Sequence, residues 1–277
     1  MRLLRIFLFA VLAALPLATF AEQPRRLAHY SHQRWIEGSE APAPVLAMAQ
    51  GQDGFLWLAT GEGLFRFDGV RFEPIEAEES GQKHGQPSAL LVTRSGDVWT
   101  NFETSRRFAV YRRGALRILD APAAPSRIVA MAEGADGAIW ALTANYDAEV
   151  LRFHNGRWRT YNAADGLPQI NAANLLVAAD GTVWIACTTG VARLRPGAAR
   201  FEIYRKALDT RVSQDPAGRI WLSEKRGSYP ITGPGGRGPP DSLRAPYRTG
   251  NAQIRGAPLL DHEGNLWIAT RYDGVQR

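Results

Sequence analysis

The chain has 277 residues, of which 45% are hydrophobic, so it is long enough to bury the core of one large domain or two small ones. Its formal net charge is +6, and its Lys and Arg residues are scattered along the chain, which argues against a nucleic-acid-binding protein. Cys187 is the only cysteine, so an intramolecular disulfide and a metal cluster held by several cysteines are both excluded.

The first residues have the layout of a secretory signal peptide. Basic residues precede an apolar run over residues 6–20, and Thr19 and Ala21 are small residues at the positions that flank a cleavage site. An uncleaved membrane anchor is the alternative, but the run is shorter than the roughly 20 residues that span a bilayer, and it contains a proline. We therefore predict a signal peptide over residues 1–21, and a mature domain over residues 22–277 that is periplasmic or extracellular.

A repeated pattern follows this segment. Six short segments share a glycine three residues before a tryptophan, as in DGFLW at residues 53–57 and DGTVW at residues 180–184. Their tryptophans stand about 40 residues apart, a period typical of the four-stranded blades of β-propellers. The repeated tryptophans are Trp57, Trp99, Trp140, Trp184, Trp221 and Trp267.

Each repeat is predicted to form four short strands. In the first repeat, an apolar segment at residues 45–49 precedes an Asp-Gly pair, which supplies the positive φ values of a tight hairpin turn. The tryptophan strand follows at residues 55–60, with apolar residues at alternating positions. Residues 63–67 are the third strand and residues 71–75 the fourth, with a glycine turn between them. Such a sheet cannot bury both faces alone, so the repeats are expected to stack around an axis.

The predicted fold class is therefore all-β, a β-propeller of four-stranded blades with six tryptophan-anchored units. We expect the repeated tryptophans to be structural anchors that pack between adjacent blades. A role as a platform for stacking sugars is the alternative for a tryptophan. It suits Trp35 and Trp158 better, because these two stand outside the repeated position.

The last two repeats depart from the pattern. After Trp221 the expected turn is replaced by residues 223–227 (SEKRG), and a Pro- and Gly-rich stretch follows at residues 230–240. That stretch lacks the Lys-Ser/Thr pair of a phosphate-binding loop, so we interpret it as a long loop or a degenerate blade edge. The sixth repeat stops where its third strand begins, at residues 274–277. We therefore expect an incomplete ring that is truncated at its C-terminal end.

Two regions of the chain resemble the two-component regulator propeller repeat family. They are residues 50–69 (QGQDGFLWLATGEGLFRFDG), and residues 165–168 (DGLP) followed by residues 180–185 (DGTVWI). The resemblance covers most of the mature chain and implies a periplasmic sensor built from a propeller that usually has seven blades. In that family the output is a histidine kinase, a diguanylate cyclase or a DNA-binding domain. The present residues contain no phosphoacceptor or ATP-binding segment, so such an activity is expected only in a C-terminal part that is missing from this chain.

Repeat and resemblance together predict an extracytoplasmic ligand-sensing domain of a two-component-type signal transduction protein. Its expected ligand is a small molecule or an oligosaccharide, and no cofactor is expected. A homodimer formed through the full-length protein is left open. We expect no nucleic-acid partner, and membrane contact only through the signal segment or a missing C-terminal helix. The alternatives are a secreted propeller enzyme such as a lyase, and a non-sensing interaction scaffold.

The sequence predicts no catalytic residue and no metal site. The five histidines are scattered, and the Asp-Gly acids recur once per repeat, which indicates a role in turns. A ligand is expected at the loops that cluster at one mouth of the central channel, namely the turns between second and third strands and the connections between blades. The candidate ligand-binding residues in these loops are Glu62, Asn145, Tyr146, Thr189, Lys225, Arg226 and Tyr272.

Overall fold

The structure is a computed structural model. It describes residues 41–76, 85–120, 127–144, 147–168, 172–206, 210–224, 227–231, 259–260, 266–269 and 275–276. The chain divides into two compact units, Met1–Ile36 and Glu37–Arg277, and every described residue belongs to the second. The predicted signal peptide therefore lies outside the described residues. Within the described ranges, no helix is long and apolar enough to cross a membrane.

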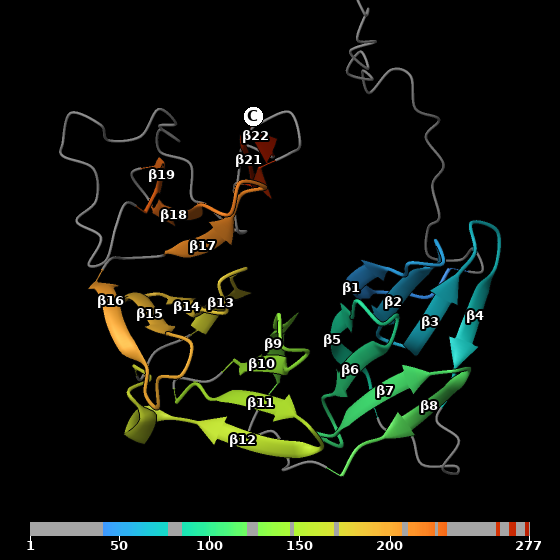
Figure 1. Ribbon diagram of the computed structural model, residues 1–277. Coiled ribbons are helices and arrows are strands. Elements are labelled where there is room, and N and C mark those ends of the chain that lie inside the picture. Colours follow the sequence, from blue (N-terminus) through green and yellow to red (C-terminus); the bar gives the residue numbers. More distant parts are fainter. Residues whose placement is uncertain are drawn as a thin grey trace, which may run out of the picture. The chain divides into compact units, whose positions relative to one another are not determined.

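Four complete sheets follow one another along the chain, and each is an antiparallel meander in which consecutive strands pair (Figure 1). We call them blades 1 to 4. Blade 1 contains β1 (Val45–Gln50), β2 (Leu56–Thr60), β3 (Gly63–Phe67) and β4 (Phe72–Ile75). Blade 2 contains β5 (Pro87–Val92), β6 (Val98–Phe102), β7 (Phe108–Arg112) and β8 (Ala115–Ile118). Blade 3 contains β9 (Ile128–Glu133), β10 (Ile139–Thr143), β11 (Val150–His154) and β12 (Arg157–Tyr161). Blade 4 contains β13 (Ala172–Val177), β14 (Val183–Cys187), β15 (Gly190–Leu194) and β16 (Glu202–Lys206).

Three strands are described in each of the next two sheets, which we call blades 5 and 6. Blade 5 contains β17 (Arg211–Gln214), β18 (Ile220–Glu224) and β19 (Gly227–Pro230), and blade 6 contains β20 (Leu259–Leu260), β21 (Leu266–Ala269) and β22 (Val275–Gln276). Although the sequence after Trp221 departs from the repeat, β18 and β19 still form a hairpin in which Ser223 pairs with Ser228. Most of the Pro- and Gly-rich stretch lies outside the described residues. The predicted all-β fold of four-stranded blades is confirmed.

The turn between the first and second strands has the same backbone hydrogen bonds in blades 1 to 5. In blade 1 the N–H of Gly54 donates to the carbonyl oxygen of Gly51 at 3.0 Å, and the N–H of Gly51 donates to that of Phe55 at 2.8 Å. Gly54 has a φ of +86°, whereas Asp53 accepts the N–H of Phe55 through Oδ1. The sequence predicted positive φ values from the Asp-Gly pair, but only the glycine has one. The turn is a three-residue loop with a bulge, and the aspartate caps it through its side chain.

The repeated tryptophans whose side chains the structure describes are buried. The five whose side chains are described are only 2 to 6% exposed. Trp57 packs in one apolar cluster with Val98 of blade 2, and Trp184 packs in another with Leu222 of blade 5. The side chain of Trp267 lies outside the described residues. Trp99 packs against Ile139 of blade 3, and Trp140 packs against Leu175 of blade 4. In blades 1 to 4 the tryptophan thus fills the space against the next sheet, so the spacing of the repeat follows the stacking of the blades.

The second strands of blades 2, 3 and 4 are buried at every residue. The sequence predicted alternating apolar positions on these strands, which is the pattern of a sheet with one solvated face. Both faces are covered here, because a neighbouring blade packs on each side. The predicted alternation is therefore absent from exposure, and in β10 (IWALT) and β14 (VWIAC) it is absent from residue type as well.

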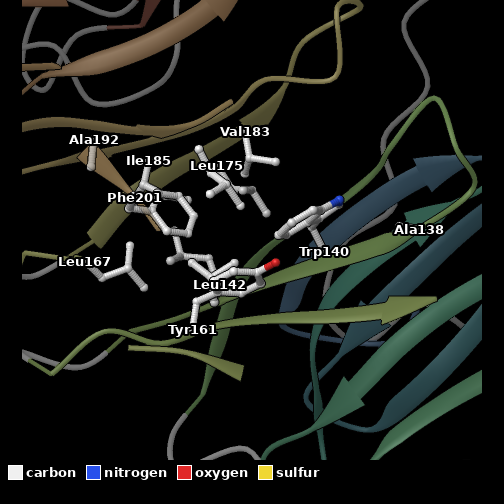
Figure 2. Packing of buried hydrophobic residues seen from close by; sticks show 12 residues of the cluster. Ala138, Trp140, Leu142, Tyr161, Leu167, Leu175, Val183, Ile185, Ala192 and Phe201 are labelled. Atoms are coloured by element: carbon white, nitrogen blue, oxygen red, sulfur yellow. The ribbon is translucent and has the colours of Figure 1, made fainter. Parts of the chain in front are cut away.

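An apolar cluster of this kind joins blade 3 to blade 4 (Figure 2). Trp140 and Tyr161 come from blade 3, and Leu175, Ile185 and Phe201 come from blade 4 or its turns. The rings of Tyr161 and Phe201 meet edge to face with their centroids 5.6 Å apart. The facing sheets are thus held by contacts along their inner and outer strands, and the pocket described below lies against this cluster.

The connection from blade 3 to blade 4 begins with the short 3₁₀ helix η2 (Ala163–Asp165). The Oδ1 of Asn162 accepts the N–H of Ala164, and a carboxylate oxygen of Asp165 accepts the N–H of Asn162. Gly166 follows with a φ of +86°, and a Cβ atom there would lie 2.3 Å from the carbonyl oxygen of Phe201. Glycine is therefore required at this place both by the backbone conformation and by the close approach of blade 4.

Candidate functional site

Two of the predicted ligand-binding residues lie in the described part of the chain. Glu62 is in the β2–β3 turn and Thr189 is in the β14–β15 turn, and both are exposed. A carboxylate oxygen of Glu62 accepts the N–H of Ala43 at 3.0 Å, and the Thr189 hydroxyl is 3.9 Å from the sulfur of Cys187. The structure gives no contact between Glu62 and Thr189, so both stay predictions. Those outside the described residues are Asn145, Tyr146, Lys225, Arg226 and Tyr272.

A pocket of about 490 Å³ lies between blades 3 and 4, and we call it the interblade pocket. It is lined by the β9–β10 turn at residues 134–136, the β13–β14 turn at residues 179–181 and the β15–β16 turn at residues 195–198. Since the strands are antiparallel, these turns lie at the opposite end of each sheet from the β2–β3 and β14–β15 turns. The pocket is as large as typical small-molecule sites. It is thus at the end of the blades where the sequence did not predict a ligand.

Arg152 projects from β11 into the interblade pocket. Its guanidinium donates to a carboxylate oxygen of Asp136 at 2.7 Å and lies 5.4 Å above the ring of Trp140. Burial raises the pKa of Asp136, but the hydrogen bonds from the backbone N–H of Ala138 and from Arg152 outweigh it, so the net pKa is lowered. The aspartate therefore stays ionised, and it holds Arg152 at the pocket wall.

Arg159 projects from β12 into the same pocket. Its guanidinium lies 4.2 Å above the ring of Tyr161 and donates to the carbonyl oxygen of Ala199 at 3.1 Å. The nearest carboxylate that it meets is that of Asp165, at 3.7 Å. Half of the Arg159 side chain remains exposed, so its N–H groups are accessible to a ligand.

Sequence reasoning missed the arginines of the third strands. Arg66, Arg152 and Arg193 stand directly opposite Trp57, Trp140 and Trp184 in the strand register. The signal was present in the third-strand segments LFRF, VLRF and VARL, each of which places an arginine between apolar residues. A lone arginine on a strand is usually a solvated residue, so this pattern alone does not indicate a binding site.

The other charged residues of the pocket lining are Asp180 and Arg195, and Arg195 forms a salt bridge of 2.9 Å with Glu202. Asp180 accepts the N–H of Thr182 through Oδ1 at 2.8 Å. In the neighbouring second strand, burial raises the pKa of the Cys187 thiol, which donates to the carbonyl oxygen of Gly190. Among the described residues, no group of three His, Cys, Asp or Glu side chains could hold a metal ion. The pocket therefore offers a ligand the guanidinium donors of Arg152 and Arg159, beside the carboxylates of Asp136 and Asp180.

Trp158, which the sequence put forward as a sugar platform, is partly buried in the core. Its ring packs against Phe108 and Phe153, with centroid distances of 4.7 and 4.9 Å. The indole thus packs against a ring of blade 2 and a ring of blade 3. The structure favours a core role for Trp158, and Trp35 lies outside the described residues.

No family model and no curated protein matches the chain, but solved structures do. The extracellular domain of the hybrid two-component system BT3049 from B. thetaiotaomicron matches with a TM-score of 0.64 and 20% identity, over 88% of this chain and 34% of that chain. A catalytically inactive virginiamycin B lyase from Staphylococcus aureus with quinupristin matches with a TM-score of 0.61 and 15% identity, over 83% and 78%. PorZ, a surface component of the type-IX secretion system of Porphyromonas gingivalis, matches with a TM-score of 0.61 and 15% identity, over 83% and 38%.

The chain therefore spans about a third of the length of the BT3049 extracellular domain. At these identities the likeness concerns the fold, and the three proteins have different roles. Together with the consecutive four-stranded blades, it shows that this chain has the fold of a β-propeller.

Proposed function

We propose that this chain is the extracytoplasmic ligand-binding propeller of a two-component-type signalling protein, and that it binds its ligand without changing it chemically. A histidine kinase or related output would then belong to a part of the protein outside this chain. The observation that carries the proposal is the sequence resemblance of residues 50–69, 165–168 and 180–185 to the two-component regulator propeller repeat. These segments build β2 and β3 of blade 1, the end of η2 and the turn that leads into β14 of blade 4.

Two further observations support a sensing domain outside the cytoplasm. The N-terminal residues have the layout of a signal peptide, with small residues at positions 19 and 21. The fold is shared with the extracellular domain of a hybrid two-component system over 88% of this chain. We propose export to the periplasm or the extracellular space, with cleavage after Ala21.

We further propose that the interblade pocket binds the ligand, which is a small molecule or one unit of an oligosaccharide. Its volume suits such a ligand, and its turns come from two blades that the Tyr161–Phe201 contact holds together. Binding residues are often carried by turns that a stable scaffold positions, as these turns are by blades 3 and 4. No cofactor is part of this proposal.

The test is a thermal-shift screen of the full chain against small molecules and oligosaccharides. A ligand that binds the folded state raises the melting temperature by mass action. Ala198 is exposed and lines the pocket, so Ala198→Trp should fill it and abolish the shift. Ala164→Trp, on the exposed face of η2 and outside the pocket lining, is the matched control and should keep the shift. Hits that survive Ala198→Trp would contradict the pocket assignment.

An enzyme, such as a lyase, is the second candidate function. The observation that favours it is the fold likeness to virginiamycin B lyase, which this chain covers over 78% of that protein's length. A lyase needs a general base within hydrogen-bond reach of the substrate. His154 is the only histidine in the described residues, and it lies beside the pocket rather than in its lining. Chromatography of each hit after incubation with the protein distinguishes the two candidates, because a lyase yields a product and a sensor does not.

A further inference from the structure

The outer hairpin of blade 3 has a face on which four basic side chains gather, and we call it the basic face. Successive residues of a strand point to opposite sides, so Arg152 and His154 of β11 share one face. Arg159 lies directly opposite Arg152 in the strand register, and Arg157 lies directly opposite His154. A hollow lies over these four residues, and no carboxylate is part of its lining. The basic face turns toward blade 4, because Arg152 is also opposite Trp140.

At the register positions of Arg152 and Arg159, blades 1 and 4 each pair an arginine with a glutamate. In blade 1 the facing residues are Arg66 and Glu73, whose side chains form a salt bridge of 2.7 Å. In blade 4 they are Arg193 and Glu202, with a salt bridge of 2.6 Å. Blade 3 has Arg159 where these blades have glutamate. Like charges directly opposite each other on paired strands are destabilising, so the arginine pair has an energetic cost that the repeat avoids elsewhere.

Neighbouring groups offset this cost only in part. Asp136 neutralises Arg152 from the pocket side, and the closest carboxylate to Arg159 is that of Asp165 at 3.7 Å. His154 is 3.2 Å from the carbonyl oxygen of Asp136, and Arg157 has no ion pair among the described residues. The face therefore retains guanidinium N–H groups without an anionic partner. Half of the Arg159 side chain is exposed and Arg157 is exposed, so solvent molecules and ligands can reach them.

We infer that the basic face binds the oxyanion of the ligand, a carboxylate, phosphate or sulfate group, through Arg157 and Arg159. A planar guanidinium matches the geometry of an oxyanion and can bind it through two parallel hydrogen bonds. Arg159 lines both the hollow over the basic face and the interblade pocket. An oxyanion at Arg159 thus leaves the rest of a small ligand within the interblade pocket. This inference rests on the proposed function, because it assigns a chemical class to the ligand of the same site.

The experiment compares glucose with three derivatives that add one oxyanion: glucuronate, glucose 6-phosphate and glucose 6-sulfate. Isothermal titration with the full chain, at constant ionic strength and ligand concentrations up to about 10 mM, detects affinities in the millimolar range. At least one of the three anions should bind saturably, and glucose should not bind detectably. The three anions also distinguish a carboxylate source from a phosphate or sulfate source. Binding should weaken as sodium chloride is added, because the contact is between charges at an accessible surface.

Two variants test the assignment to the basic face. Arg159→Gln and Arg157→Gln should each lower the affinity for the anion about tenfold, the loss expected for one charge-assisted hydrogen bond. Arg157 is exposed, so its substitution should leave the fold intact, which circular dichroism and the melting temperature will show. Arg117→Gln is the matched control. Arg117 has the register position of Arg159 in blade 2, but it faces Val110, so its loss should not change binding.

Three results would overturn the inference. The first is that none of the three anions binds. The second is that an anion binds wild type, Arg157→Gln and Arg159→Gln equally well. The third is that duplex DNA of equal phosphate concentration binds the basic face more tightly than all three anions, which would assign it to a polyanion. If neutral hits bind and Ala198→Trp abolishes their binding while the anions fail, the oxyanion site is wrong and the proposed function stands.

Discussion

Asp215 accepts a hydrogen bond of 2.9 Å from the indole N–H of Trp221, the anchor of blade 5. The same carboxylate accepts the backbone N–H of Arg219 at 2.8 Å and its guanidinium at 2.6 Å. Only 1% of the Asp215 side chain is exposed. The first turn of blade 5 has the same backbone hydrogen bonds as the first turns of blades 1 to 4. In addition, its carboxylate accepts a hydrogen bond from the core tryptophan.

This contact predicts a loss of stability in acid. Burial raises the pKa of Asp215, but the three hydrogen bonds outweigh it, and the pKa in the folded protein is below the ordinary value. The unfolded chain therefore binds the proton more readily than the folded protein does. The contribution of Asp215 to the unfolding free energy is present above the unfolded pKa of about 3.9, and it is lost as the pH falls through the folded pKa. In urea titrations, Asp215→Asn should be less stable than wild type at pH 7, and the difference should shrink as the pH falls below about 4. A difference that does not change with pH would contradict this.

Trp184→Ala should destabilise the domain by about 3–5 kcal/mol, the usual range for emptying a large buried aromatic site. The ring is 5% exposed and meets Tyr204 edge to face with the centroids 5.0 Å apart. Its indole N–H has no hydrogen-bond partner among the described residues. Trp184→Phe should therefore cost much less, because it keeps a ring in the cluster and removes an unpaired donor. Chemical denaturation measures both, and equal losses for the two variants would show that ring packing is not the source of the stability.

Gly166→Ala should destabilise the domain more than Gly114→Ala. Both glycines have a positive φ, +86° and +88°, so an alanine at either place has the conformational cost of about 1–2 kcal/mol. A Cβ at Gly114 meets nothing within 4 Å, whereas a Cβ at Gly166 would lie 2.3 Å from the carbonyl oxygen of Phe201. Only Gly166→Ala must therefore move blade 4 away from η2. Equal melting temperatures for the two variants would show that the close approach of Phe201 to Gly166 does not affect stability.

Export should produce a mature chain that begins after Ala21. The apolar run over residues 6–20 and the small residues before the cleavage point provide the features that signal peptidase recognises. Intact-mass spectrometry of protein released from the periplasm should give a mass that lacks residues 1–21. Recovery of the full-length chain from the membrane fraction would instead support an uncleaved anchor.

The sequence predicted the fold well because the repeat is dictated by local chemistry. A glycine three residues before each tryptophan fixes the hairpin, and the tryptophan must be buried, so strand order and the stacking of blades both follow. The structure places Trp57 and Trp184 in the clusters that this reasoning requires. Even the altered repeat at Trp221 keeps the turn, since Gly218 has a φ of +82°.

The candidate site could not be predicted in the same way. The sequence reasoning nominated turn residues such as Glu62 and Thr189 from their position alone, and the interblade pocket lies at the other end of the sheets. The pocket depends on which residues face each other across strands, and register is not visible in a single repeat. Arg159 becomes informative only when β11 and β12 are aligned, because its partner Arg152 then has no glutamate opposite it.

The proposed function requires that the propeller binds a ligand between blades 3 and 4 and leaves it unchanged. The most direct measurement is equilibrium dialysis of the full chain with the best acidic ligand, followed by mass spectrometry of the ligand recovered after prolonged incubation. We predict saturation at one ligand per chain, recovery with an unaltered mass, loss of binding in Arg159→Gln and normal binding in Arg117→Gln. A product that forms in proportion to protein concentration, and that disappears when Arg159 is replaced, would contradict the claim and identify the chain as an enzyme.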